Sequence, residues 1–497
     1  MTIVRIEFHC ALEVACTLVA LLAMPGCAVG PTYVKPATEA PADWSSWHGG
    51  DAGQGDIASK GPLQPDWWLL FDDPVLNRLE QRALAASPDL QTAALHFAQA
   101  RVQRSTVAAQ RGPQVDASAG ATRQRMSEYG SGTRIVDALV ADRTELIRVL
   151  SQPFTLYQAG FDASWELDLW GRVRRSIEAA DADVAQQAAL LDSVRLGIAS
   201  DVARDYFLLR TTQQQVQLTQ DEIAALEQRL NLIEARVQAG VIDHLDLDRQ
   251  RTELLALKSQ LPDLMTQAAG HENQLTLLLG DRPGALRDEL RPRAGASTTP
   301  PPDLALGLPS EVAQRRPDIR AAEAHLRSAT ATIGVAKADL YPHVTIGANF
   351  GYESYLSSEF TYWGSRTWSI GPSLSLPLFD HGRRQSVVEL RELQQQEAAV
   401  AYQRTVLQAW QEIDDALRGY SSERNKLQQL TDRVRSAKDA YGLTQAKYDA
   451  GTVDFVAVLD SQRSFLQARR DVASSRGQLE VKFVAVNKAV GNVPEQR

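Results

Sequence analysis

Hydrophobic residues recur every seven positions in two long stretches of the chain. The first series is Val202, Leu209, Val216, Ile223, Leu230 and Val237, and the second is Ile413, Tyr420, Leu427, Val434, Tyr441 and Tyr448. A strict seven-residue repeat is typical of helices packed as a coiled coil. The roughly 65 residues between Gly171 and Gly240 would extend about 100 Å as a helix. The pattern therefore predicts helices much longer than a small globular domain needs.

Other stretches alternate between apolar residues and small or polar ones. Val344, Ile346, Ala348, Phe350 and Tyr352 form one apolar series, and Trp368, Ile370, Pro372, Leu374, Leu376 and Leu378 form another. The second series covers positions 368–378, and a tilted strand crosses a membrane with about 9 to 11 residues. Val115 to Ala121 and Phe161 to Leu169 repeat the pattern more faintly. The alternation predicts two membrane β-hairpins, and taken alone it also fits half-buried hairpins of a soluble sandwich.

The chain contains the same plan twice. The segment SPDLQTAALHFAQA from Ser87 matches RPDIRAAEAHLRSA from Arg316, an offset of 316 − 87 = 229. Further along, three glycines match three others at an offset of 211: Gly171, Gly240 and Gly280 pair with Gly382, Gly451 and Gly491. The difference, 229 − 211 = 18, predicts an insertion of that length in the first hairpin loop. We expect a first repeat at 87–280, a Pro-rich connector at 281–310, a second repeat at 311–491 and a tail at 492–497.

Glycine is expected to end each long helix. Gly240 and Gly451 follow the two heptad series, and glycine adopts a positive φ at little cost. A returning helix would then run to Gly280 or Gly491. Each repeat therefore combines a membrane hairpin with a long helical hairpin, whose far tip carries AGVIDHLD or AGTVDFVA.

The N-terminus has the features of an export signal. Its apolar run, Val14 to Met24, is well short of the roughly 20 residues of a membrane-spanning helix. Gly26 and Cys27 follow, and a small residue before cysteine predicts a lipoprotein cleavage site. Residues 1–26 are then the signal peptide, Cys27 is the lipidated first residue, and 27–86 form an extended segment leading into an equatorial region. Secretion without a lipid is the alternative.

Composition excludes several classes of function. The formal charge is 52 − 61 = −9, which disfavours a nucleic-acid binder because such a protein needs a basic field. The three cysteines are Cys10, Cys16 and Cys27, and none follows, so the body offers no disulfide, Cys-ligated zinc site or thiol nucleophile. The histidines are scattered, and HExxH, GxSxG and a phosphate-binding glycine loop are absent. We expect no catalytic residue, metal or cofactor.

Four strands per chain cannot stand alone in a membrane. An open sheet in lipid leaves its edge N–H and C=O groups without hydrogen bonds, and a closed barrel needs at least about eight strands. Copies of the chain must therefore associate, with two, three or four copies supplying eight, 12 or 16 strands. A barrel continuous with a ring of long helices is a conduit, which indicates transport.

Five motifs resemble the TolC superfamily, and in particular its lipoprotein branch, the outer-membrane channels of tripartite multidrug efflux systems. They are CAVGPTYVKP, WWLLFDDPVLNRL, LLLGDRPGAL, GLPSEVAQRRPDIRAAE and YDAGTVDFVAVLDSQR. The resemblance covers essentially the whole mature chain. It implies a homotrimer with a 12-stranded β-barrel continuous with a coiled-coil periplasmic α-helical tunnel, lipid-anchored in the bacterial outer membrane. The implied partners are a periplasmic adaptor (membrane fusion protein) and an inner-membrane transporter of the resistance-nodulation-division (RND) class.

The resemblance also places a gate and a docking surface at the helical tips. The residues matching the family's gate are Tyr448, Val456, Asp460 and Arg463, and the adaptor-docking turns are Ala239, Gly240, Val241, Ala450, Gly451 and Thr452. From the sequence alone, Asp460 and Arg463 also fit an ordinary exposed i,i+3 pair. The acids Asp243, Asp246 and Asp248 predict a cation-attracting ring after trimerisation or, equally, a solvated helix start.

Three other functions compete with drug or small-molecule efflux. An enzyme lacks any recognisable motif, and a lipid-anchored coiled-coil scaffold or adhesin explains the heptads but not the alternating strands. A type I protein secretion duct shares the same architecture. The substrate does not follow from the sequence, because a passive tube exports what its pump delivers.

Overall fold

The computed structural model describes residues 28–36, 58–59, 64–130, 144–240, 243–292, 304–305, 312 and 315–495. Cys27, the predicted signal peptide at 1–26 and Val241 therefore lie outside the described residues. The chain divides into two compact units. The first holds the residues up to Val34, Ala100–Asp183 and Leu326–Ala398, and the second holds Lys35–Gln99, Val184–His325 and Ala399–Arg497. Within the described ranges, no helix has the length and apolar character of a membrane span.

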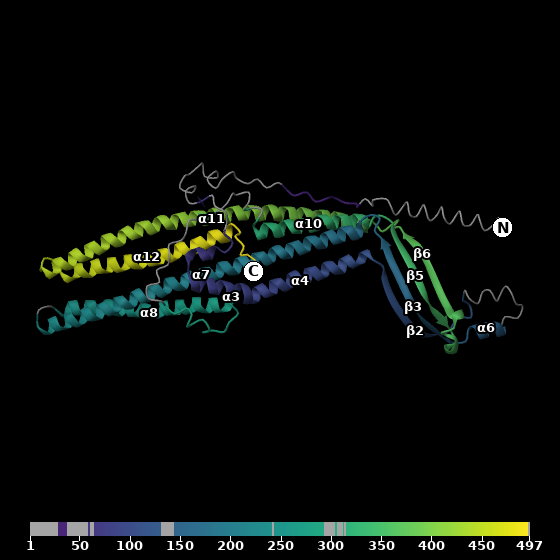
Figure 1. Ribbon diagram of the computed structural model, residues 1–497, viewed down its shortest axis with the longest axis horizontal. Coiled ribbons are helices and arrows are strands. Elements are labelled where there is room, and N and C mark those ends of the chain that lie inside the picture. Colours follow the sequence, from purple (N-terminus) through teal and green to yellow (C-terminus); the bar gives the residue numbers. More distant parts are fainter. Residues whose placement is uncertain are drawn as a thin grey trace. The chain divides into compact units, whose positions relative to one another are not determined.

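The elements follow one another twice in the same order (Figure 1). The first series is α4 (Pro88–Ala108), η3 (Ala109–Arg111), β2 (Gln114–Gln124), α6 (Thr144–Leu150), β3 (Phe154–Leu167), α7 (Arg172–Gln238) and α8 (His244–Leu278). The second is α10 (Pro317–Ala338), β5 (His343–Ser354), η4 (Ser357–Glu359), η5 (Trp363–Ser365), β6 (Arg366–Ser375), α11 (Arg383–Asp449) and α12 (Phe455–Ala489). Before them come η2 (Trp67–Phe71) and α3 (Pro74–Ala86), and β1 (Ala58–Ser59) pairs with β4 (Leu304–Ala305) in parallel.

The long helices confirm the heptad prediction. Helices α7 and α11 each have 67 residues, and α8 and α12 each have 35. Their start points give 383 − 172 = 211 and 455 − 244 = 211, which is the offset of the paired glycines. Gly240, Gly280, Gly451 and Gly491 all have a φ of 70° or 71°, so each helix ends at the glycine expected. The heptad residues are buried or half-buried.

The first unit contains a four-stranded antiparallel sheet in the order β2-β3-β5-β6. Its register aligns Ala117, Phe161, Phe350 and Trp368 on one row, and Asp116, Asp162, Asn349 and Ser369 on the next. One face is therefore apolar and the other polar, because side chains alternate along each strand. Neither β2 nor β6 has a partner on its outer side among the described strands.

The strand ends differ from the alternation in two places. The prediction of a strand over 368–378 was wrong at both ends, since β6 runs from Arg366 to Ser375. Pro377 has no N–H to give to a ladder, which is consistent with pairing that stops before it. Leu169 lies outside β3, because Asp168 instead accepts hydrogen bonds from the backbone N–H of Val173 and Arg174 at 3.0 and 2.9 Å and so caps α7.

The insertion lies where the repeat arithmetic predicts it. The loop between β2 and β3 covers positions 125–153, and the loop between β5 and β6 covers positions 355–365. The corresponding lengths are 153 − 124 = 29 and 365 − 354 = 11, and 29 − 11 = 18 equals the predicted insertion. Helix α6 forms within the longer loop.

Helical segments of the first unit contact one another in the order α4, α7, α10, α11, which parallels the strand order β2-β3-β5-β6. Arg104 of α4 bonds to Asp181 of α7 at 2.7 Å, and Lys337 of α10 bonds to Glu392 of α11 at 2.8 Å. Between α7 and α10, the side chain of Arg175 lies against the backbone of Gly334, where a Cβ would meet it at 2.8 Å. Helices α4 and α11 are thus the outermost members of the row, and no residue of α4 is buried.

An aromatic core holds the second unit together. Phe71 lies 4.7 Å from Phe207 and 5.2 Å from Phe483, measured between ring centroids, and Trp67 packs on Phe483 at 6.0 Å. Helix α3 adds Val75, Leu76, Leu79 and Ala83, all fully buried. Asp73 caps α3 by accepting from the N–H of Val75 at 2.8 Å, and it also accepts a hydrogen bond from the Tyr206 hydroxyl. This core fixes the base from which the helical hairpins extend.

Candidate functional site

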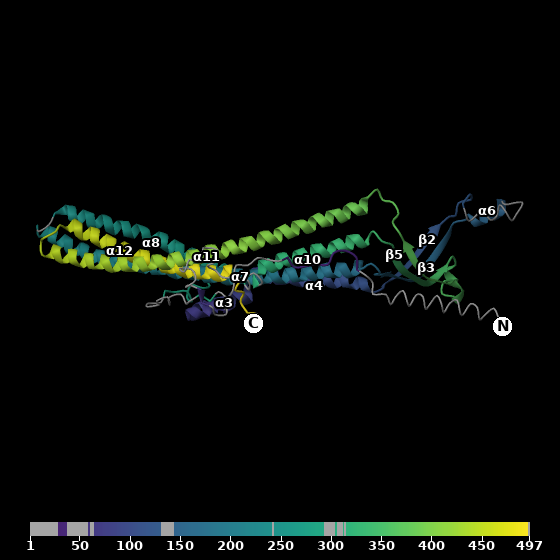
Figure 2. The same ribbon diagram turned by 90° about the horizontal axis from the view of Figure 1, so that it is seen from above.

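The two helical hairpins of the second unit end side by side, and Figures 1 and 2 both show the tips of α7, α8, α11 and α12 together. The first turn begins with bonds from the Ala239 N–H to the Ala235 carbonyl at 3.0 Å and from the Gly240 N–H to the Val237 carbonyl at 2.9 Å. Added Cβ atoms at Gly240 and Gly451 would meet nothing within 4 Å. Glycine is needed there for its positive φ, not for space.

The second turn is closed by both backbone and side-chain hydrogen bonds. Both the N–H and the hydroxyl of Thr452 donate to the Lys447 carbonyl at 2.9 Å. Asp454 then caps α12 by accepting from the Ala457 N–H at 3.0 Å. In the first turn Asp243 holds the equivalent N-cap position but makes no side-chain cap bond. The exposed residues Ala450, Gly451 and Thr452 therefore stand on a well-ordered turn.

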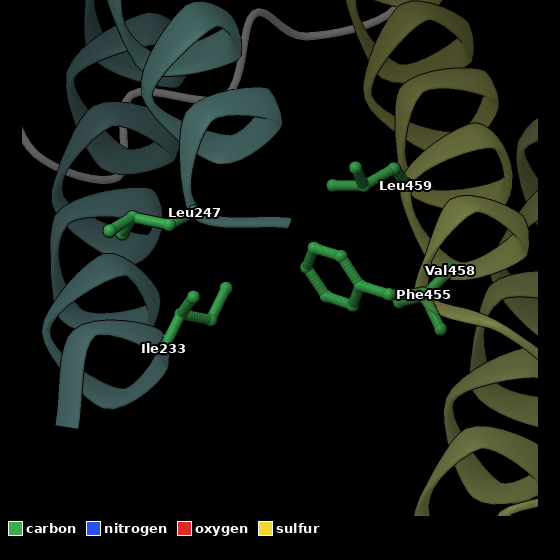
Figure 3. Close-up of a cluster of buried hydrophobic side chains, with 5 residues drawn as sticks. All are labelled: Ile233, Leu247, Phe455, Val458 and Leu459. Carbon is green, nitrogen blue, oxygen red and sulfur yellow. The ribbon is translucent and has the colours of Figure 1, made fainter. Parts of the chain in front are cut away.

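A hydrophobic cluster joins the two tips (Figure 3). Its buried members are Ile233 from α7, Leu247 from α8, and Phe455, Val458 and Leu459 from α12. In Figure 3 the Phe455 ring points from α12 toward Ile233 and Leu247. Tyr448 packs against the cluster, with its ring 5.5 Å from that of Phe455. Burial of these apolar side chains holds the second hairpin to the first at their far ends.

Arg463 pairs more closely with the other hairpin than with its own helix. Its guanidinium contacts the Glu253 carboxylate of α8 at 2.6 and 2.8 Å, through two of its nitrogens. Asp460, predicted as its partner, is 3.9 Å away and 67% exposed. The hydrogen bond that Arg463 donates to Glu253 raises the pKa of Arg463 above its ordinary value. Of the four predicted gate residues, Tyr448 lies in the apolar cluster, Val456 is half-buried and Asp460 faces solvent.

A second polar link crosses between the hairpins. Arg229 of α7 donates to the Tyr441 hydroxyl of α11 at 2.6 Å and to the side-chain oxygen of Gln462 in α12. Tyr441 in turn stacks on Phe465, with the rings 6.0 Å apart and 10° from parallel. Sequence reasoning missed Glu253, Arg229 and Gln462, because no spacing within one helix indicates a partner that is 210 to 233 residues away.

The three tip acids do not form an isolated negative patch. Asp246 lies 3.5 Å from Arg249, and Asp248 lies 3.8 Å from Arg251. Arg251 also bonds to Glu234 of α7 at 2.8 Å. Asp243 is exposed at the start of α8. Each chain thus offers acids at the first tip that are partly balanced by neighbouring arginines.

Further from the tip, a buried carboxylate links α7 to α12. Glu222 accepts from Arg470 at 2.7 Å, and its side chain is only 2% exposed. Burial raises the pKa of Glu222, and the charge of Arg470 opposes that rise. Among the described residues, no group of three or more His, Cys, Asp or Glu side chains could hold a metal ion. Apolar packing, hydrogen bonds and ion pairs between helices therefore hold the described part of the tip together.

Comparison with known proteins gives a consistent result over nearly the whole chain. The profile of the family described as outer membrane efflux protein matches residues 79–281 and 308–492. The solvent efflux pump outer membrane protein SrpC of Pseudomonas putida is 31% identical over 475 residues, 95% of this chain and 96% of that protein. The pyoverdine export outer membrane protein OpmQ of Pseudomonas putida is 31% identical over 481 residues, with 96% of each chain covered. The solved outer-membrane channel OprN is 30% identical, has a TM-score of 0.84 and covers 94% of this chain and 99% of its own.

Proposed function

Because this chain belongs to the outer membrane efflux protein family and is an outer-membrane channel of a tripartite efflux system, we propose that three copies assemble into one conduit. The family acts as a passive channel and not as an enzyme. The conduit would combine a 12-stranded β-barrel with a periplasmic tunnel of α-helices. Cargo would pass through it from an inner-membrane pump to the exterior.

The single observation that carries this proposal is the pair of open edges on the sheet. In a bilayer the outer N–H and C=O groups of β2 and β6 need partners, and another copy can supply them. The apolar face supports a lipid environment, since Trp368, Ile370 and Leu374 each expose 68% to 70% of their surface. The polar face carries Asp116, Asp162 and Asn349 and would line water. The family resemblance selects three copies over two or four.

The helices, like the strands, support a ring that is closed by neighbouring copies. The row α4, α7, α10, α11 leaves α4 and α11 at its two ends, as the sheet leaves β2 and β6. Leu95 and Val102 of α4 are 63% and 67% exposed, and Val400 and Leu407 of α11 are 65% and 69% exposed. Each pair is spaced by seven positions, which is the spacing of a coiled-coil seam. We propose that these two helices meet between neighbouring copies.

We propose that the helical tips form the gate, with Tyr448, Val456, Asp460 and Arg463 as its residues in the second hairpin. Glu253 joins this set because it is the partner of Arg463. The turns at Ala239, Gly240, Val241, Ala450, Gly451 and Thr452 would dock the periplasmic adaptor, and all of them except Val241, which lies outside the described residues, are exposed. Asp243, Asp246 and Asp248 would form an acidic ring at the tunnel entrance. Opening then requires the contacts between the two hairpins of each chain to loosen.

We also propose the processing, the repeat boundaries and the partners that the sequence predicts. Residues 1–26 would be removed and Cys27 lipidated, with 87–280 and 311–491 as the two structural repeats. The partners would be a periplasmic adaptor and an RND-class transporter. The names of two relatives specify solvent efflux and pyoverdine export. Related channels are thus named for two different small molecules, which supports small-molecule export ahead of type I protein secretion or a scaffold role. It also supports a channel whose cargo is selected by the pump.

The test is to extract the full-length protein from membranes in detergent, determine its mass by light scattering and insert it into planar bilayers. We expect a particle of three chains that produces discrete conductance steps. A single-chain particle, or a trimer that never conducts, would contradict the proposal.

A further inference from the structure

Charges are sorted unequally between the two faces of the sheet. The polar face carries the acids Asp116, Asp162, Glu166 and Glu353. The apolar face contains no Asp or Glu at any strand position from β2, β3, β5 or β6. Its only charged residues are two arginines, Arg123 and Arg366, which stand on the edge strands β2 and β6. Both lie at the loop ends of their strands, away from the long helices.

Neither arginine has an acidic partner among the residues that the structure describes. Arg123 is exposed, and its side chain forms no hydrogen bond or ion pair within those ranges. Arg366 donates to the Trp363 carbonyl at 2.7 Å, and its guanidinium carbon lies 4.2 Å from the centroid of the Trp363 ring. A cation over an indole ring is held in place without being neutralised. Both guanidinium charges thus remain available to an anion from outside the chain.

The duplication predicts how neighbouring copies would pair. In β3 and β5, Phe161 lies opposite Phe350. Position 161 in β3 corresponds to 161 + 211 = 372 in β6, and position 350 in β5 corresponds to 350 − 229 = 121 in β2. If β6 of one copy pairs with β2 of the next as β3 pairs with β5, Pro372 would face Ala121. Two positions further on, Arg123 would face Ile370, with Trp368 diagonally beside it. Arg366 would then lie on the same face of the same joint, four positions beyond Ile370.

The depth of Arg123 matches the edge of a membrane. Arg123 is eight positions from Val115 along the strand, a distance of about 26 Å. At a strand tilt near 40° this corresponds to about 20 Å along the membrane normal. An arginine side chain can extend several ångströms further toward water, so its guanidinium reaches the limit of an apolar band about 25 Å tall. Tyr362, Trp363 and Trp368, all more than 60% exposed, surround this level as an interfacial aromatic belt would.

We propose that Arg123 of one copy and Arg366 of its neighbour form, at each joint of the trimer, a binding site for the phosphate groups of a phosphorylated outer-leaflet glycolipid. Guanidinium groups bind phosphate through paired, charge-assisted hydrogen bonds. A lipid headgroup is the anion at this depth, and its acyl chains would lie along Ile370 and Trp368. The inference rests on the proposed trimer, because the site is incomplete in a single chain.

The experiment is native mass spectrometry of the full-length trimer in detergent. The probes are a deep-rough lipopolysaccharide carrying its lipid phosphates, the same glycolipid after phosphatase treatment, and phosphatidylglycerol. We expect the phosphorylated glycolipid to bind most tightly, and Arg123→Gln and Arg366→Gln each to weaken it about fivefold. The double variant should bind it no better than the dephosphorylated form. Arg123→Lys with Arg366→Lys should retain part of the preference.

Arg391→Gln is the matched control, because Arg391 lies on α11 and bonds to Gln394, away from the sheet. It should bind lipid as the wild type does. Equal binding of the two glycolipids, or wild-type binding by the double variant, would overturn the lipid site while leaving the trimer intact. Equal binding of phosphatidylglycerol would assign the site to any anionic lipid and overturn the choice of glycolipid. A wild-type mass of one chain would instead contradict the trimer itself.

Discussion

Arg463 of α12 forms its ion pair with Glu253 of α8 at 2.6 Å, whereas Asp460, three positions before it on its own helix, stays 3.9 Å away. The pair connects the returning helices of the two repeats across 210 residues of sequence. Together with the Phe455 cluster, it holds the second hairpin against the first. In the proposed channel these contacts set how easily the tip opens.

We expect Glu253→Gln to raise the single-channel conductance in planar bilayers more than Asp460→Asn does. The amide keeps the shape of Glu253 but removes the charge, so the strong hydrogen bonds to Arg463 weaken by about 1 kcal/mol or more. Asp460 is mostly exposed and lies 3.9 Å from Arg463, so its loss should open the gate less than the loss of Glu253 does. A larger effect from Asp460→Asn would shift the gate to that residue, and no effect from either would remove Arg463 from the gate.

Phe455→Ala should loosen the tip without unfolding the protein. The ring is 7% exposed and fills the cluster between the hairpins, and truncating a buried Phe costs about 3 to 5 kcal/mol. Hydrogen exchange of the first turns of α12 should accelerate by a factor between about 100 and about 4,000, since each 1.4 kcal/mol is a factor of about ten. Leu443→Ala is the control, because Leu443 is 66% exposed on α11. Unchanged protection in Phe455→Ala would show that the cluster does not stabilise the tip.

Glu80 predicts a pH dependence of stability in the aromatic core. Its side chain is fully buried, both carboxylate oxygens lack a partner, and burial together with Asp66 raises its pKa well above the usual value. A raised folded pKa means that this group's contribution to stability is fully present below about pH 4.5 and is lost as the pH rises through the folded pKa. Within that window the loss is about 1.4 kcal/mol per pH unit.

Glu80→Gln should therefore have a higher Tm than the wild type at pH 8, and the difference should shrink toward pH 5. Calorimetry of the detergent-solubilised protein across this range measures it. Glu397→Gln, which changes an exposed acid on α11, should follow the wild-type curve. Parallel curves for Glu80→Gln and the wild type would mean that Glu80 is ionised in the folded protein.

Helix length and helix ends could be predicted from sequence because both signals are local. The heptad spacing predicted α7 and α11, and Gly240 and Gly451 predicted where they stop. The first half of β3 was missed because Leu156 and Tyr157 are adjacent apolar residues that point to opposite faces, so the alternation is lost.

The polar contacts of the site could not be predicted in this way. The Arg229 link to Tyr441 and the Arg463 link to Glu253 join helices from different repeats. Their side chains meet because of how α7, α8, α11 and α12 pack, and that packing depends on the cluster around Phe455. The pairing of Asp460 with Arg463 was predicted from their spacing on one helix. That spacing shows which side chains can touch, but not which of two carboxylates lies closer to the Arg463 guanidinium.

Cys27→Ser should abolish labelling by a radioactive fatty acid while trimers still form. In the proposed lipoprotein the acyl chain would attach to Cys27 as the first residue of the mature chain, and no cysteine follows it. The barrel itself would insert into the membrane, so the assembly does not depend on the lipid. Labelling that persists in Cys27→Ser would refute the lipoprotein assignment, and loss of the trimer would make the anchor necessary for assembly.

The central claim is that copies join edge to edge through β2 and β6, and a cysteine crosslink tests it most directly. The repeat offsets convert the observed pair Ala163 and Ala348 to 163 + 211 = 374 and 348 − 229 = 119. Directly opposite residues are about 5 Å apart, within disulfide reach. In one chain these positions are three strands apart, or about 14 Å, and 374 − 366 = 8 positions out of register, or about 26 Å along the strand, which is far too great a separation for a disulfide.

Oxidation of the Ala119→Cys, Leu374→Cys variant in membranes should therefore yield covalent chains of up to three subunits on a non-reducing gel. The control Ala119→Cys with Ile370→Cys, four positions out of register, should remain uncrosslinked. A single-chain band from the first variant, or equal crosslinking of both, would contradict the assembly.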